Sequence, residues 1–219
     1  MRSAEFEDLA ERLLAVKSRN VTLDLVDLSE PQQAVVDHLE AFFRGHEVRV
    51  ARPIAVRVGE RAPGFAVASI GSGPRLQQLR TVVSLGCWDA THEGGHGLEF
   101  AIVGPEDADE RLAELLALTA FYHCGPPAQR LDHGHTVPIG EAWLPGSACD
   151  HLLVSLPYPF GPEFETCAWT NAHARILWLL PISAAERSHK AEHGLEALEE
   201  KFDEGGGMRF WDPLRPSVV

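Results

Sequence analysis

Hydrophobic residues in this sequence recur at two spacings, which predict helices in some segments and strands in others. Apolar positions three and four residues apart place side chains on one face of a helix, and they predict helices over residues 4–17, 29–45, 107–122 and 184–202. Alternating apolar positions and short apolar runs predict strands over residues 21–25, 48–50, 54–58, 64–70, 81–87, 98–103, 131–139, 151–156, 166–170 and 176–180. Residues 76–80 are predicted to form a single helical turn.

Local signals mark the ends of these elements. Two of the predicted helices begin with a capping box, in which two side chains three residues apart satisfy free backbone N–H groups. Ser29 and Gln32 form one box, and Ser183 and Glu186 form the other. Pro181 is expected to end the strand before the second box, because proline fixes its own φ and restricts the residue before it.

The order of the elements predicts an α+β fold, with a mixed, mostly antiparallel sheet and helices packed against it. Strands 81–87 and 98–103 are neighbours in sequence and are expected to pair. The β elements within residues 1–80 are too short to be stable alone, so we expect residues 1–219 to form a single domain. A content of 45% hydrophobic and 23% charged residues is ordinary for a globular protein.

Several short motifs follow one another in the order found in one protein family. They are Gly97-Leu98-Glu99-Phe100, Asp132-His133-Gly134-His135, Leu180-Pro181-Ile182, Gly194-Leu195 with Leu198, and Asp212-Pro213-x-Arg215-x-Ser217-Val218-Val219. Together they resemble the suppressor of fused (SUFU) domain family over residues 82–219, with helix 107–122 in the position of a family helix. The sequence departs from the family's Gly-x-Glu-Leu-x-Phe strand at Phe100, a position that is expected to be buried.

The resemblance implies a SUFU-like fold and a protein-binding module that has no catalytic activity and no cofactor. Animal members of the family look like cytoplasmic tethers of transcription factors. Bacterial single-domain members look like immunity proteins that neutralise polymorphic toxins. A short, acidic chain suits the second role, with a basic toxin as its protein partner. Two alternatives stay open: a regulatory scaffold for an endogenous partner, and a metal-dependent enzyme.

The charge of the chain bears on its partners. With 19 Lys and Arg against 32 Asp and Glu, the formal net charge is −13. Such a surface disfavours nucleic acid and anionic membranes and attracts basic partners, unless its acidity serves solubility alone. One basic segment is expected on the solvated face of a sheet and holds Arg44, Arg49, Arg52, Arg57 and Arg61. No apolar run approaches the roughly 20 residues of a membrane span, and the acidic N-terminus lacks a secretory core, so we expect a cytoplasmic protein.

Two segments are candidate protein-binding surfaces. The loop 156–164 carries Tyr158, Phe160 and Phe164 among three prolines, and a stiff aromatic loop loses little entropy on binding. Its aromatic side chains fold back onto the core in the alternative interpretation. An acidic cluster at the start of helix 107–122 holds Glu106, Asp107, Asp109 and Glu110; the alternative is an ordinary solvated helix face.

The candidate metal ligands are His133 and His135, because residues two apart on a strand share a face and could reach one ion. The sequence offers His151, His92, His96 and Cys124 as third ligands, but it has no HExxH motif. An HxH pair is also expected by chance among 11 histidines. The four cysteines, Cys87, Cys124, Cys149 and Cys167, have no metal-site or disulfide spacing and are expected to be reduced and buried.

Overall fold

The structure, a computed structural model, describes residues 27–53, 57–205 and 209–219. Its helices are α2 (Glu30–Phe42), α3 (Cys87–Thr91), α4 (Asp109–His123), α5 (Pro162–Glu165), α6 (Ala184–His193) and α7 (Leu195–Glu204), with 3-10 turns at Val58–Glu60, Glu106–Ala108 and Pro127–Gln129. Its strands are β1 (Val48–Ala51), β2 (Ala66–Ile70), β3 (Leu79–Leu85), β4 (His96–Pro105), β5 (Thr136–Pro138), β6 (Cys149–Ser155), β7 (Thr166–Trp169) and β8 (Ala172–Ser183). The predicted helix 4–17 and strand 21–25 lie outside the described residues.

The described strands form one sheet of eight strands in the order β1-β2-β3-β4-β8-β6-β5, with β7 paired to β8 beside this path. Strands β4 and β8 pair in parallel, and the other paired strands are antiparallel. The predicted α+β class with a mixed, mostly antiparallel sheet is therefore confirmed. The predicted pairing of segments 81–87 and 98–103 is also confirmed, since Val83 lies opposite Ala101.

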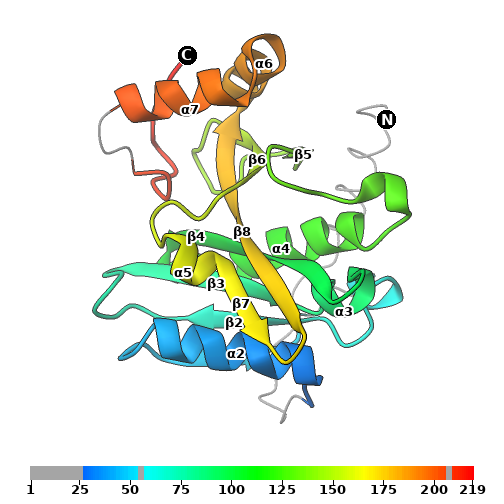
Figure 1. The fold of residues 1–219 in the computed structure, drawn as a ribbon. Coiled ribbons are helices and arrows are strands. Elements are labelled where there is room, and N and C mark those ends of the chain that lie inside the picture. Colours follow the sequence, from blue (N-terminus) through cyan, green and yellow to red (C-terminus); the bar gives the residue numbers. More distant parts are fainter. Residues whose placement is uncertain (1–26, 54–56, 206–208) are drawn as a thin grey trace.

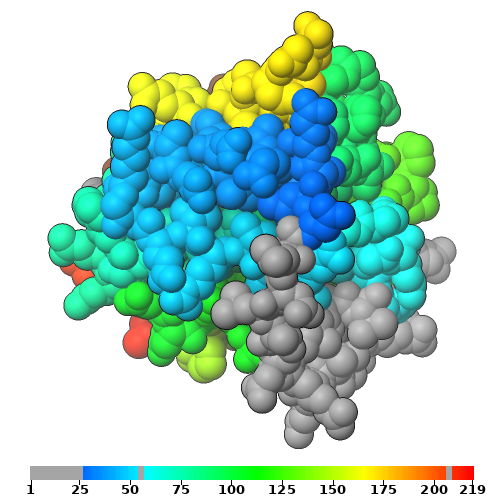
Figure 2. All heavy atoms as spheres, turned by 90° about the horizontal axis from the view of Figure 1, so that it is seen from below, coloured from blue at the N-terminus to red at the C-terminus, as the bar shows by residue number. Residues whose placement is uncertain are grey.

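The central strands are buried on both faces, so adjacent residues belong to different hydrophobic clusters. On β3, Val82 belongs to the cluster that contains Leu115 of α4, whereas Val83 belongs to the cluster that contains Val35 of α2. The two helices accordingly lie on opposite sides of the sheet (Figure 1). Figure 2 shows α2 across its face of the molecule, with the segment around β7 along one margin.

Strand β8 joins two halves of the molecule. Its first part pairs with β4 and β7, and its last part, from Trp178 to Ser183, pairs with β6. We call α2, β1–β4, β7 and α4 the proximal half, and β5, β6, α6 and α7 the distal half; they lie toward the two ends of β8 in Figure 1. In the distal half, Leu198 and Phe202 of α7 form a separate hydrophobic cluster with Leu180 of β8.

The prediction that Pro181 ends its strand is wrong. Pro181 lies within β8 opposite Leu152 of β6, and its carbonyl accepts a hydrogen bond of 2.7 Å from Arg215. The pairing of β8 with β4 stops at Trp178, so one edge of β8 has no described strand partner at the proline. Proline is tolerated in a strand where its missing N–H is not needed by a neighbour.

Three other local predictions also need correction. The predicted helix 184–202 is divided into α6 and α7 at Gly194, whose φ of 95° suits glycine because it has no Cβ. The predicted turn 76–80 is not helical, since β3 already begins at Leu79. Val58, predicted in strand 54–58, lies in a 3-10 turn, and residues 54–56 are outside the described ranges. Both predicted capping boxes are present, at the starts of α2 and α6.

Candidate functional site

The aromatic loop contributes one exposed ring to the surface. Tyr158 is 59% exposed, and its hydroxyl donates a hydrogen bond of 3.1 Å to Glu199. Phe160 is partly buried, and Phe164 is fully buried against Phe42. The prediction of Phe164 as a contact residue is therefore wrong, because the ring packs under α2, and the alternative of aromatics folded onto the core holds for it.

The predicted acidic cluster lies where the 3-10 turn Glu106–Ala108 leads into α4. Arg80 lies 3.9 Å from the Glu106 carboxylate and 3.8 Å from the Asp109 carboxylate, so two of the four charges have a cation nearby. Asp107 and Glu110 are exposed and form no ion pair with any described residue. These two carboxylates are three residues apart and so lie on the same side of the helix start.

A groove of about 950 Å³ opens beside this cluster, and we call it the acidic groove. Asp107 lines it from the 3-10 turn before α4, Arg111 from α4, and Glu141 from the loop between β5 and β6. The positive charge of Arg111 is already shared by Glu141 at 2.8 Å and Glu114 at 3.4 Å, so the groove keeps an acidic surplus. Its remaining walls are mostly apolar and come from Pro105, Ala108, Trp143, Leu144, Pro145 and Pro213.

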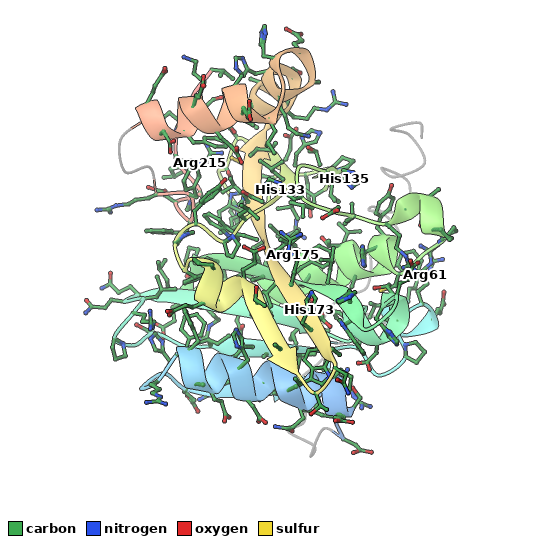
Figure 3. The ribbon with its side chains drawn as sticks, in the orientation of Figure 1. Arg61, His133, His135, His173, Arg175 and Arg215 are labelled. Carbon is green, nitrogen blue, oxygen red and sulfur yellow. The ribbon has the colours of Figure 1, made fainter. Side chains whose placement is uncertain are left out.

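The basic segment does not form a patch on one face of the sheet. Arg49 projects from β1 and pairs with Glu47 at 2.7 Å. Arg61 instead covers the ring of Phe121 at 3.8 Å and donates to the carbonyl of the same residue, at one side of the molecule near α4 (Figure 3). Its expected place on a sheet face is therefore wrong.

None of the helices in the described ranges has the length and hydropathy needed to cross a bilayer.

The predicted metal pair lies in a turn rather than on a strand. Gly134, between the two histidines, has a φ of 83°. The backbone is therefore not extended there, and the spacing of two residues does not place both side chains on one face of a strand. The ring Nδ1 of His135 accepts a hydrogen bond from the backbone N–H of Asp132, and His133 Nε2 lies 3.8 Å from a Glu199 carboxylate oxygen. Within residues 27–53, 57–205 and 209–219, no group of three or more His, Cys, Asp or Glu side chains is arranged to hold a metal ion.

The proposed third ligands are engaged elsewhere. His92 stacks on Trp88 with ring centroids 4.1 Å apart, and His151 bonds to Asp150 at 2.7 Å. Cys124 is half-buried while the other three cysteines are buried, and all four are free.

A second cavity, of about 340 Å³, was missed by the sequence analysis, and we call it the histidine–arginine cavity. It lies at the C-terminal end of α4 and is lined by His123, Arg130, His96, His173 and Arg175. His173 and Arg175 follow one another along β8 (Figure 3), and His96 is the residue of β4 directly opposite His173. These residues are far apart in the sequence and come together through the parallel pairing of β4 and β8. They therefore form no local sequence motif.

His123 has a structural part in this cavity. Its Nδ1 accepts a hydrogen bond of 2.9 Å from the Leu131 N–H, and its Nε2 lies 3.3 Å from the Thr91 hydroxyl. Burial, together with the nearby charge of Arg130, lowers the pKa of His123 to about 4. The ring is therefore neutral at neutral pH, with both nitrogens engaged.

The comparison with known proteins defines the class of this protein. Residues 61–216 match the model of the suppressor of fused protein (SUFU) family, so the chain belongs to the suppressor of fused family. A suppressor of fused homolog from Neisseria gonorrhoeae FA 1090 is 34% identical, with a TM-score of 0.73 over 87% of this chain and 97% of that chain. The resemblance carried by the sequence motifs is thereby confirmed.

Two more distant structures share the fold. A chain of the Sufu–Fu complex is 13% identical, with a TM-score of 0.61 over 86% of this chain and 92% of that chain. Drosophila Suppressor of Fused is also 13% identical, with a TM-score of 0.59 over 86% of this chain and 51% of that chain. A search of curated proteins finds no match.

Proposed function

We propose that this protein is a non-catalytic module that binds a basic protein partner through the acidic groove. The observation that carries the proposal is the surplus of carboxylates around a groove with apolar walls. Protein interfaces combine an apolar centre with a polar rim in the same way. The related chain in the Sufu–Fu complex is part of an assembly, which supports a binding role for the fold.

The charges of the groove favour a basic partner over an acidic one. Asp107 lines the groove and Glu110 lies next to its lining residue Arg111 in the sequence. Both are exposed without an ion pair to any described residue, and the whole chain has a formal net charge of −13. Complementary charge raises the rate of encounter and suppresses wrong partners more than it raises affinity. The apolar wall residues that keep exposed surface, Pro105, Ala108, Pro145 and Pro213, then supply area that a partner's side chains can bury.

The proposal extends to the kind of partner, a basic toxin that the module neutralises by covering its active surface. Toxins that cleave nucleic acid carry basic surfaces because their substrates are polyanions, so an acidic groove fits them. A partner that is an endogenous protein rather than a toxin would make the same module a regulatory scaffold.

The test asks whether a basic protein is encoded beside the gene and, where one is, measures its association with the full chain. The double variant Asp107→Lys with Glu110→Lys reverses two exposed charges that have no ion pair with a described residue, so we expect the fold to be retained. We expect the association rate to fall at least about tenfold and its salt dependence to weaken. Suppression of toxicity on co-expression should fall in parallel.

A matched control separates the groove from net charge. The double variant Glu196→Lys with Glu200→Lys makes the same charge change on exposed positions of α7. We expect it to bind almost as well as the parent. Equal losses in both variants would assign the effect to net charge and exclude the groove as the binding surface.

A further inference from the structure

The histidine–arginine cavity is lined by hydrogen-bond donors that nothing in the described structure uses. Arg175 donates from Nε and Nη2 to Glu165 at 2.9 and 2.6 Å, but its Nη1 makes no hydrogen bond to a described residue. Arg130 donates only Nη1, to the His123 carbonyl at 2.8 Å. Both guanidinium groups therefore keep N–H groups available beside a cavity of about 340 Å³.

The two histidines at the cavity form an unusual contact. Their Nδ1 atoms are 3.1 Å apart, so one ring donates to the other through a single shared proton. The ring that accepts this bond carries its own proton on Nε2. Nε2 of each ring has no described partner, so the accepting ring can still donate an N–H to a ligand.

Charges of both signs surround the cavity. Glu93 and Asp132 line it beside Arg130 and Arg175, Asp132 lies 3.8 Å from Arg175 Nη1, and Glu165 holds the other side of the Arg175 guanidinium. The feature that points to a ligand is therefore the set of N–H groups on Arg130 and Arg175 that face one cavity and have no hydrogen-bond partner among the described residues.

We propose that the histidine–arginine cavity binds an oxyanion, the phosphate or carboxylate group of a small ligand, between Arg130, Arg175 and the pair His96 and His173. Guanidinium groups bind such anions by charge-assisted hydrogen bonds. The proposal stands apart from the acidic groove, which lies at the other end of α4.

The test is a titration of the full chain with sodium sulfate and, separately, with sodium acetate, at constant ionic strength. Histidine ring signals are followed by NMR. We expect saturable shifts of His96 and His173 with a dissociation constant below about 10 mM. Saturation by sulfate alone identifies a phosphate-like ligand, and saturation by acetate alone identifies a carboxylate.

Variants show whether the cavity holds the anion. Arg130→Gln should weaken binding about tenfold, the effect of one charge-assisted hydrogen bond. Arg175→Gln should do the same, provided that its thermal unfolding shows a folded protein, because this arginine also holds Glu165. The control Arg44→Gln makes the same charge change on an exposed position of the loop after α2 and should leave binding unchanged. Absence of saturation by either anion, or an equal loss in the control, would overturn the proposal.

Discussion

The two halves of the molecule each bury one glutamate, and they treat it in opposite ways. In the proximal half, Glu99 is 1% exposed and accepts hydrogen bonds from Ser84 Oγ at 2.5 Å and from the N–H groups of Gly86 and Trp88 at 2.8 and 3.0 Å. No described residue forms an ion pair with it. Burial therefore dominates and raises the pKa of Glu99 to about 7, although these hydrogen bonds oppose the rise.

In the distal half, Glu186 is equally buried but has a cation. Arg215 donates from both Nη atoms to the two carboxylate oxygens at 2.7 and 2.8 Å, and the N–H groups of Ser183 and Val218 also point at the carboxylate. Burial alone would raise the pKa of Glu186, but the bonds and charge of Arg215 outweigh it and lower that pKa.

The comparison shows that the partner, and not the degree of burial, sets the charge of a buried carboxylate. The two glutamates also differ in which segment of the chain each one holds in place. Glu99 orders the segment Gly86–Trp88 that leads into α3, close to it in sequence, whereas Glu186 fixes the C-terminal segment 212–219 against the start of α6. The distal half thus depends on an ion pair between residues 29 positions apart in the sequence.

The largest effect is expected from Arg215→Ala. The substitution leaves the Glu186 carboxylate buried without its cation and removes the bond to the Pro181 carbonyl. Removing one partner of a buried pair lowers the free energy of unfolding by about 3–5 kcal/mol. Urea denaturation measures the loss.

The matched control for that variant is Arg209→Ala, which removes an exposed arginine just before the C-terminal segment. It should change the free energy of unfolding by less than about 0.5 kcal/mol. A loss of under about 1 kcal/mol in Arg215→Ala would mean that the ion pair does not hold the distal half together.

The next largest effect is on the pH dependence of the free energy of unfolding, to which the two glutamates contribute with opposite sign. Because the pKa of Glu99 is about 7 in the folded state against its usual 4.5, the folded protein binds the extra proton between these values. The carboxyl therefore makes stability fall as pH rises through this window, by about 3 kcal/mol in total. Glu186 acts in the opposite sense, since its pKa is lowered: its contribution is present above pH 4.5 and is lost as pH falls further.

The variant Glu99→Gln should remove the first of these two slopes and leave the second. The amide oxygen can still accept from Gly86 and Trp88, which both bond to Oε1, and the amide N–H can donate to Ser84. Urea denaturation at several pH values compares the variant with the parent. If both show the same fall between pH 4.5 and 7, then the pKa of Glu99 is not raised.

The sequence predicted those parts of the fold that depend on residues close together in the chain. The capping boxes at Ser29 and Ser183 were found because each is complete within four residues. The strand through Pro181 was not found, because its tolerance of proline depends on where the pairing with β4 stops. Gly194 carried a local signal that the prediction passed over, since glycine commonly ends a helix in the left-handed conformation.

For the candidate sites too, the sequence predicted what neighbouring residues form and missed what distant segments form together. The acidic cluster was found because Asp107 and Glu110 are neighbours in sequence, but the apolar walls of the groove come from segments as distant as Pro213. His96 and His173 are 77 residues apart and meet only through the parallel register of two strands.

The smallest expected effect compares the capping serines of the two halves. Ser29→Ala and Ser183→Ala each remove the acceptor for the N–H at the third helix position, which typically costs about 1 kcal/mol. Ser183 is buried, so water cannot replace its hydroxyl, and we expect the loss there to approach about 2 kcal/mol. Ser29 is half-buried, but its hydroxyl also donates to Asp89 at 2.9 Å. Thermal unfolding of both variants decides between these influences: a larger loss for Ser29→Ala would mean that the bond to Asp89 outweighs burial, and that the proximal half relies on a charged contact as the distal half does.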